Sequence, residues 1–297
     1  MRQICLLLTL LVLVLAGNVL AGTEIVRFVD ATSLKNNPNN RYFIKALDLA
    51  LRKSEKQYGD YFLKAIDIPI TQQRHFVELA LGRIDVFWTM ASPLRENFAR
   101  AVPVPLAFGS YGIRLLAINK ASQSFFAGVT NQVELSEFIA LTGQDWPDTI
   151  ILRESGLRLD DSHSEHDFYT LLQGNPQYYY PRGVTEIYSE LSGPNGVGVE
   201  VEPNLAFVYP TVMYFYVAND NKLLANRLEA GLKAALADGS LEALFLSFPE
   251  HSEAFKQAQL HKRQLIKLVN NNLPKGVVAS DIEKLQQKLI NTVSDRQ

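Results

Sequence analysis

One short segment of the chain brings together an indole, two hydroxyl groups and a guanidinium. Trp88 and Thr89 end an apolar stretch, and Ser92 and Arg95 follow shortly after it. A guanidinium offers a planar fork of N–H donors that matches a carboxylate, and neighbouring hydroxyls can complete such a clamp. The flat face of an indole can form the wall of a ligand pocket. These four residues are therefore candidates for binding a small carboxylate.

Two of these side chains also have a purely structural interpretation. Arg95 precedes Glu96, and surface arginines commonly pair with a nearby acid. Spacing alone favours this interpretation for Arg95. Trp88 lies in a predicted strand, where aromatic side chains usually belong to the core. A core role and a cleft role for Trp88 remain equally open.

Three further charged residues are candidates for the same site. Arg114 follows Gly109 and Gly112, whose backbone freedom can let it reach a cleft. Arg182 and Glu186 have i, i+4 spacing at a predicted helix start, so their side chains can face the same way. Together they could hold both charges of a zwitterionic ligand. A structural ion pair is as good an interpretation of Arg114, and a slightly better one of Arg182 with Glu186.

The chain has no sequence motif of a known enzyme class. It lacks a Gly-x-Ser-x-Gly elbow, a His-Glu-x-x-His pair and a cysteine nucleophile. Histidines and acids gather between Asp160 and Asp167, with His163 and His166 among them. Acids are favoured electrostatically at a helix start, so a solvated helix start explains this cluster better than a metal site does. We expect no catalytic residue, no metal and no cofactor.

The elements that position these residues alternate between strands and helices, which predicts crossover units and α/β lobes. Strands are expected at residues 25–29, 62–66, 84–88, 115–118, 205–209 and 213–217. Helices are expected at residues 42–58, 73–81, 133–141, 148–154, 167–172, 184–191, 221–237, 241–248, 254–269 and 281–293. Gly82 is the expected C-terminal cap of the second helix, and Asp220 the expected N-cap of helix 221–237. The pattern restarts after Arg114 without a Pro/Gly-rich linker, which indicates two lobes joined by crossing strands.

The N-terminal residues predict export. Arg2 precedes an apolar run from Ile4 to Ala16, which is shorter than the about 20 residues that span a membrane. Val19-Leu20-Ala21 fits a small-residue cleavage site, so we expect a signal peptide cleaved near Ala21 and a periplasmic protein. The only cysteine, Cys5, lies inside this segment, which excludes disulfides in the mature chain. A net charge of −2 makes a nucleic-acid partner improbable.

The order of these motifs resembles the type II periplasmic solute-binding proteins, close to the amino-acid-binding group (family 3 solute-binding proteins). The helix exit Gly82-Arg83-Ile84-Asp85, the hydroxyls of Thr89 and Ser92, and Arg95 follow one another as in that family. Residues 143–146, 180–186 and 238–248 match later blocks, so the resemblance covers residues 24–275. In relatives, the arginine at the position of Arg95 clamps a ligand carboxylate. The turn before Arg95 is shorter here, and Arg182 and Glu186 stand near the place of the relatives' second-lobe aspartate.

The resemblance implies an α/β protein with a two-lobe type II periplasmic-binding-protein-like fold, with mixed, mainly parallel sheets and a cleft between the lobes. Residues 1–21 are the expected signal peptide, 22–112 the first part of lobe 1, 113–218 lobe 2, and 219–297 the second part of lobe 1 with a C-terminal helical extension.

The implied function is binding of a small polar solute, an amino acid or related carboxylate, by hinge closure for ABC-type uptake. The implied partners are that ligand and a membrane permease or sensor protein, and the chain is expected to be a monomer. A ligand-sensing or partner-binding component without transport is the alternative, and a small-acid lyase on the same scaffold is a third.

Overall fold

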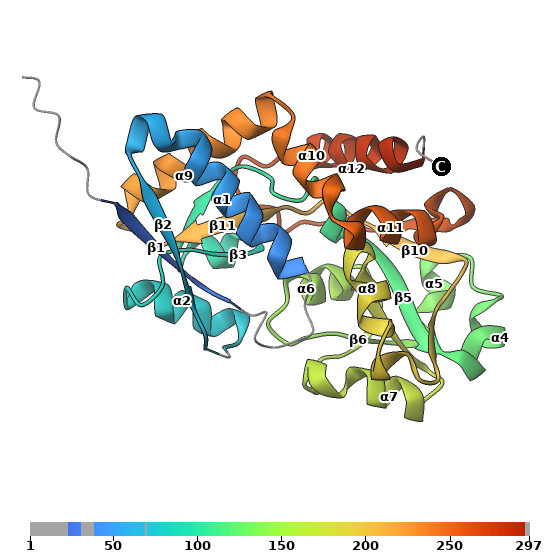
Figure 1. The fold of residues 1–297 in the computed structure, drawn as a ribbon. Helices are drawn as coiled ribbons and strands as arrows, with labels where there is room; N and C mark the ends of the chain where they lie inside the picture. Colours follow the sequence, from blue (N-terminus) through green and yellow to red (C-terminus); the bar gives the residue numbers. More distant parts are fainter. Residues whose placement is uncertain (1–22, 31–38, 69, 295–297) are drawn as a thin grey trace, which may run out of the picture.

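The computed structural model describes residues 23–30, 39–68 and 70–294 of the 297-residue chain. The expected signal peptide lies outside these residues. The described chain forms two groups of strands, each covered by helices (Figure 1). None of the described helices is both long and apolar enough to cross a membrane.

Lobe 1 contains two short sheets, whose strands come from residues 24–102 and residues 213–217. The strands β1 (Glu24–Val29) and β2 (Tyr61–Ile66) pair in parallel, and β11 (Met213–Val217) lies antiparallel between β3 (Phe87–Met90) and β4 (Arg100–Val102). Its helices are α1 (Asn39–Tyr58), α2 (Gln72–Ala80), α3 (Pro93–Glu96), α9 (Lys222–Ala237) and α10 (Ser240–Ser247). The long helices α1 and α9 pack against each other.

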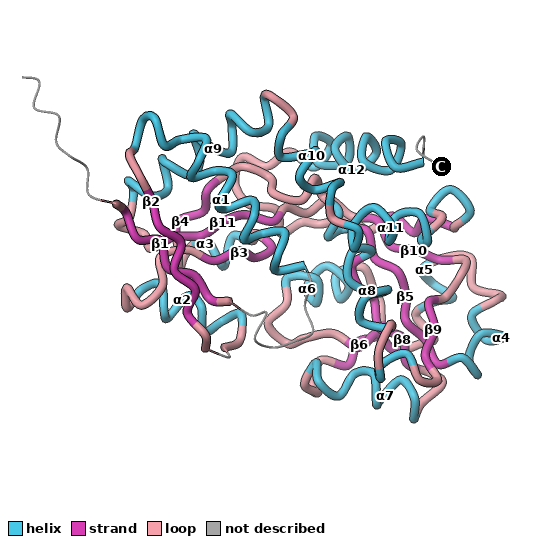
Figure 2. Tube along the Cα trace, in the orientation of Figure 1, coloured by secondary structure: helices cyan, strands magenta, loops and turns pink. Residues whose placement is uncertain are grey.

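Lobe 2 contains a seven-stranded mixed sheet with the order β12-β10-β5-β8-β6-β7 and with β9 paired to β5. Its strands are β5 (Ile113–Asn119), β6 (Ile139–Leu141), β7 (Arg158–Asp160), β8 (Tyr178–Gly183), β9 (Val199–Val201), β10 (Leu205–Val208) and β12 (Gln264–Lys267). Its helices are α4 (Gln123–Phe126), α5 (Gln132–Leu135), α6 (Pro147–Glu154), α7 (Phe168–Gly174) and α8 (Val184–Leu191). Figure 2 shows the strands of this sheet on the right and the strands of lobe 1 on the left, as two separate groups.

The last part of the chain contacts both lobes. Helix α11 (Pro249–Ala258) packs against α8 of lobe 2, and β12 pairs in parallel with β10. Helix α12 (Ala279–Ser294) then returns to lie beside α11. The predicted assignment of residues 219–297 to lobe 1 therefore does not hold for β12, which adds an edge strand to the sheet of lobe 2.

Two segments carry the backbone directly between the sheets, residues 103–112 from β4 to β5 and residues 209–212 from β10 to β11. They touch, because the amide of Tyr209 donates a 3.0 Å hydrogen bond to the carbonyl of Gly112. A Cβ atom added to Gly112 would lie 1.9 Å from the carbonyl oxygen of Tyr209. Only glycine allows this close approach.

Most predicted elements are present within a few residues of their expected bounds, and the two-lobe α/β fold class is confirmed. Gly82 has φ +62°, as its predicted capping role requires. The central strands β5 and β11 are buried almost throughout, which explains their continuous apolar runs.

Three local predictions were wrong. The expected helix 133–141 ends at Leu135, and β6 follows it between β7 and β8. The expected helix 254–269 ends at Ala258, because Gln259 adopts φ +45° and the chain then enters β12. Short apolar runs fit a helix or a buried strand equally well, and only pairing with neighbouring strands decides. The N-cap of α9 is Asn221 rather than Asp220.

Candidate ligand-binding cleft

A cleft of about 560 Å³ is lined by residues of both lobes. This volume lies within the range of small-molecule sites. The walls follow the ends of β3, β6 and β8, where the carboxyl ends of strands place ligand-binding side chains in open α/β sheets. Its polar and aromatic lining includes Asn40, Phe43, Thr71, Gln72, His75, Trp88, Thr89 and Tyr111 from lobe 1, and Arg114, Gln144, Asp145, Trp146, Asp148, His163, Glu165, His166, Arg182 and Glu186 from lobe 2.

Trp88 and Thr89 form part of the lobe 1 wall. The indole of Trp88 stacks on the ring of Phe43 with the centroids 5.6 Å apart, and its Nε1 lies 3.4 Å from Asn40 Oδ1. The hydroxyl of Thr89 donates a 3.1 Å hydrogen bond to Gln72 Oε1. Trp88 is half-buried, so the two interpretations open from the sequence both apply: one face packs on the core and the residue still lines the cleft.

Ser92 and Arg95 have protein partners. Ser92 caps α3, and its Oγ lies 3.4 Å from the amide of Arg95. The buried guanidinium of Arg95 donates to the Thr89 hydroxyl, to the Met90 carbonyl at 3.0 Å and to Gln72 Oε1 at 2.8 Å. Neither Ser92 nor Arg95 lines the cleft as the described residues define it.

Arg95 also reaches lobe 2, where its Nη2 lies 3.1 Å from the carbonyl oxygen of Asp145. Burial lowers the pKa of Arg95, although the nearby acids Asp145 and Asp148 oppose this shift. The residue that the resemblance assigns to a ligand carboxylate thus connects the two lobes in this structure.

The lobe 2 wall contains a buried ion-pair network centred on Arg114. Its Nη2 lies 2.7 Å from Asp148 Oδ1, its Nη1 3.6 Å from Glu186 Oε2, and its Nε donates a 3.1 Å hydrogen bond to the Tyr209 hydroxyl. That hydroxyl in turn donates to Asp148. Burial acts against the charge of Arg114, but Asp148, Tyr209 and Glu186 raise its pKa above the ordinary value. Arg114 therefore remains a fixed cation.

Arg182 and Glu186 meet as predicted, but across a strand–helix junction. Arg182 belongs to β8, and its Nη2 lies 3.2 Å from Glu186 Oε1 and 2.7 Å from Glu190 Oε1. The Arg182 guanidinium lies 5.5 Å from the ring centroid of Trp146. Glu186 Oε2 also accepts a 3.2 Å hydrogen bond from the amide of Gly183, at the start of α8. Burial raises the pKa of Glu186 despite the two nearby arginines.

The charges of this network do not cancel. The cations Arg114 and Arg182 face the carboxylates of Asp148, Glu186 and Glu190. When all five groups are ionised, the carboxylates outnumber the guanidinium groups. Glu190 does not line the cleft, but Asp145, Asp148, Glu165 and Glu186 do, so the carboxylates also outnumber Arg114 and Arg182 on the lobe 2 wall itself.

Several lining residues were not among the predicted site residues, notably Gln72, Trp146 and Asp148. Trp146, Pro147 and Asp148 open α6 directly after β6. The available signal was a strand end followed by a helix start, which is where α/β sheets hold ligands. That signal was lost because β6 was predicted as part of a helix.

The histidine and acid cluster of residues 160–167 borders the cleft through His163, Glu165 and His166. His163 Nδ1 lies 3.1 Å from Asp160 Oδ1. Burial opposes ionisation of Asp160, but hydrogen bonds from Ser162, Tyr178 and His163 hold its pKa at about 2. In the described part of the chain, no group of three or more His, Cys, Asp or Glu side chains could hold a metal ion.

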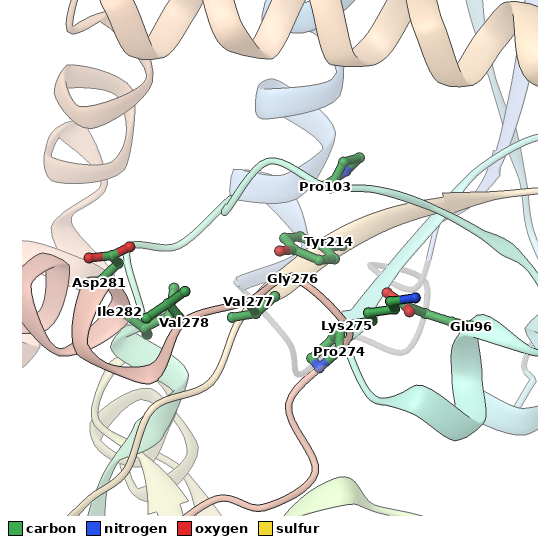
Figure 3. A pocket seen from close by; sticks show the side chains of 10 residues that line it. All are labelled: Glu96, Pro103, Tyr214, Pro274, Lys275, Gly276, Val277, Val278, Asp281 and Ile282. Carbon is green, nitrogen blue, oxygen red and sulfur yellow. The ribbon is translucent and has the colours of Figure 1, made fainter.

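A second cavity of about 370 Å³ lies on lobe 1 beside the first turn of α12 (Figure 3). Its polar lining residues are Glu96, Tyr214, Lys275 and Asp281, and its apolar ones are Pro103, Pro274, Val277, Val278 and Ile282. Burial, helped by Glu96, raises the pKa of Tyr214 to about 12. None of the predicted site residues lines this cavity.

Comparison with solved structures identifies the fold. No protein-family model and no curated protein sequence matches the chain. A periplasmic binding protein of Salmonella typhimurium with high arginine specificity is 12% identical, with a TM-score of 0.52 over 75% of this chain and 97% of that one. A structure from work on glutathione import via GshT and the cystine ABC importer TcyBC of Streptococcus mutans is 15% identical, with a TM-score of 0.54 over 76% of this chain and 95% of that one.

A sensor protein has the same architecture. A histidine kinase sensor domain with similarity to periplasmic binding proteins is 16% identical, with a TM-score of 0.50 over 76% of this chain and 95% of that one. At such identities the likeness establishes the fold and leaves the ligand open. The chain has the two-lobe α/β fold of the type II periplasmic solute-binding proteins.

Proposed function

We propose that this protein binds a small zwitterionic solute, an amino acid or a related carboxylate, between its two lobes. The observation that carries the proposal is the cleft itself, which both lobes line with aromatic rings and charged groups. Contacts from both lobes would stabilise a closed state over an open one, which is the basis of hinge closure. Trp88, Thr89, Ser92, Arg95, Arg114, Arg182 and Glu186 stay the proposed ligand-binding set, extended by Gln72, Trp146 and Asp148.

Lobe 1 would hold the carboxylate of the ligand. Thr89 and Gln72 line this wall, and Arg95, which does not itself line the cleft, is hydrogen-bonded to both. A ligand oxygen that replaces Gln72 Oε1 or the Asp145 carbonyl would receive a charge-assisted hydrogen bond from Arg95. Ser92 would act indirectly, by capping the short helix that carries Arg95.

Lobe 2 would hold the cationic group of the ligand. Asp148 and Glu186 belong to a wall in which carboxylates outnumber guanidinium groups. Arg114 and Arg182 would then position these acids. Proteins of the same fold that bind arginine or lysine support a ligand with this charge pattern.

The same reasoning extends to location and partners. We propose that the chain is exported with cleavage near Ala21, acts as a monomer in the periplasm and delivers its ligand to an ABC-type permease. The lobe boundaries near residues 112 and 218 are part of this proposal, with β12 assigned to lobe 2. The second candidate is a ligand-sensing component without transport. It is favoured by the sensor domain of the same fold and by a C-terminal segment that contacts both lobes.

Thermal unfolding in the presence of amino acids and small carboxylates tests the binding proposal. We expect at least one compound to raise the Tm of wild type but not of Arg95→Ala. Both tryptophans of the chain, Trp88 and Trp146, line the cleft, so ligand titration should also change the intrinsic fluorescence. Absence of any stabilising compound across a broad library would overturn the binding proposal and favour a component that binds a partner instead of a small ligand. Recovery of a chemically altered ligand would point to the lyase instead.

A further inference from the structure

Two connections between the lobes, residues 103–112 and residues 209–212, meet beside the C-terminal helix α12. Gly109 and Gly112 belong to the first connection, and Tyr209 and Pro210 to the second. The amide of Tyr209 donates to the carbonyl of Gly112 at 3.0 Å. Lobe movement in hinge proteins is absorbed by φ/ψ changes at a few such residues. A rotation of either connection must therefore displace it against the other.

Gln286 of α12 binds both connections with one side-chain nitrogen. Its Nε2 donates hydrogen bonds of 2.9 Å to the carbonyl of Gly109 and 2.9 Å to the carbonyl of Tyr209. The residue is 2% exposed. A carboxamide nitrogen has two N–H groups, so one goes to each connection. The Oε1 atom of Gln286 is buried and has no hydrogen-bond partner among the described residues. The polar contacts of this side chain to the described residues are therefore the two bonds that Nε2 donates.

A second amide from the same part of the chain holds the second connection. The Nδ2 of buried Asn270 donates a 2.9 Å hydrogen bond to the carbonyl of Pro210. Asn270 and Gln286 thus contact successive carbonyls of the β10–β11 connection. Neither side chain reaches the ligand cleft.

Helix α12 is anchored firmly enough to support these contacts. Ile282 is buried in the lobe 1 cluster that contains Tyr214, and Leu289 is buried in the large core cluster. Lys288 pairs with Glu242 of α10, which lies beside α12 in Figure 1. The Gln286 side chain is therefore carried by a helix that is held against lobe 1 at Ile282 and Lys288 and that also packs on α11.

We propose that Gln286 is a hinge clasp: it holds the two connections in register and so favours the lobe arrangement of this structure. Rotation at residues 109–112 and 209–212 would move the carbonyls of Gly109 and Tyr209 apart and break at least one bond of Gln286. Removing the clasp should widen the range of lobe orientations. The proposal rests on the two-lobe fold and requires no particular ligand.

Distance measurements between the lobes test this proposal without ligand. Spin labels would be placed by Lys56→Cys in α1 and Ser124→Cys in α4, both exposed and in different lobes (Figure 1). The full chain with Cys5→Ser would otherwise contain no cysteine. Pulsed electron spin resonance would compare wild type, Gln286→Leu and the matched control Gln287→Leu. Gln287 is the exposed neighbour on the same helix and bonds Asn291.

We expect Gln286→Leu to broaden or shift the inter-lobe distance distribution, with Gln287→Leu superimposing on wild type. Circular dichroism of each labelled protein would verify folding. A folded Gln286→Leu protein with the wild-type distribution would overturn the proposal. If Gln286→Leu does not fold, Asn270→Ala decides: a broader distribution supports the clasp, and an unchanged one refutes it. Neither result bears on whether the cleft binds amino acids.

Discussion

The Nη2 atom of Arg95 donates a 3.1 Å hydrogen bond to the carbonyl oxygen of Asp145, and so joins lobe 1 to lobe 2. The same guanidinium is bound to Thr89, Met90 and Gln72 of its own lobe. A ligand carboxylate would therefore have to exchange with these acceptors. Under the proposed function, a ligand oxygen that replaces the Asp145 carbonyl would break the bond between the lobes, and this would couple ligand binding to the lobe arrangement at Arg95.

Replacing Arg95 with Met should destabilise the protein as well as weaken ligand binding. The change removes the Arg95 donor from two acceptors in buried residues, the Thr89 hydroxyl and the Met90 carbonyl, and each group left unsatisfied costs about 1–3 kcal/mol. Urea unfolding would measure the lower free energy. Arg52→Met in α1 is the control, because Arg52 is exposed and 3.8 Å from Asp48, and should change stability by less than about 0.5 kcal/mol. Equal stability of wild type and Arg95→Met would contradict the buried role of this residue.

Removing Asp148 should be among the most damaging single changes in the cleft. Asp148→Ala leaves the buried charge of Arg114 without its 2.7 Å partner, and loss of one member of a buried pair costs about 3–5 kcal/mol. The matched control is Asp161→Ala, which breaks an exposed 2.7 Å pair with Arg153 and should cost about 0–1 kcal/mol. Chemical denaturation of both variants gives the comparison. Similar losses at the two sites would refute the claim that burial makes the Arg114 pair critical.

Gly112 should tolerate no larger residue. The Cβ of Gly112→Ala would lie 1.9 Å from the Tyr209 carbonyl oxygen, so the two connections would have to separate. We expect a loss of at least about 1–3 kcal/mol, as for other overpacked sites. Gly128→Ala is the control, since its Cβ would meet no atom within 4 Å. Thermal unfolding should show a clear fall in Tm only for Gly112→Ala.

The stability of the protein should fall as the pH falls from about 6.5 toward 4, in part because of His251. Burial lowers the pKa of this histidine to about 4, although its contacts with Phe245 and Glu250 act in the opposite direction. The unfolded chain, with an ordinary histidine pKa of about 6.5, binds more protons over this range. Protonation therefore favours unfolding, by about 2 kcal/mol at pH 5 for this group alone.

Unfolding free energies at pH 7 and pH 5 for wild type and His251→Gln would isolate that contribution. His251→Gln should be less stable than wild type at pH 7, because the change removes the imidazole ring that packs on Phe245 with the centroids 4.2 Å apart. Its stability should nevertheless depend less on pH than that of wild type. His261→Gln, far less buried in η6 (Leu260–Lys262), serves as the control. An undiminished pH dependence in His251→Gln would assign the effect to other groups.

Much of the architecture could be predicted from the sequence, because its signals are local. Periodic apolar positions predicted α1, α9 and α12, and glycine marked the end of α2 at Gly82. Residues 139–141 and 264–267 could not be assigned in this way. Each holds only two or three apolar residues and becomes a strand because β8 or β10 lies beside it. Pairing between distant segments leaves no local pattern to read.

The candidate site, like the fold, could be predicted from the sequence only in part. The sequence by itself determined which chemical groups are present: a guanidinium at Arg95 among hydroxyls, a second charged group at Arg182 and Glu186, and an aromatic ring at Trp88. Only the tertiary structure decided their partners, because burial and distance belong to the folded chain. It bound Arg95 to Asp145 across the lobes and added Asp148 and Trp146 to the cleft. It also brought Gln286 to the two inter-lobe connections, which lie far from it in the chain.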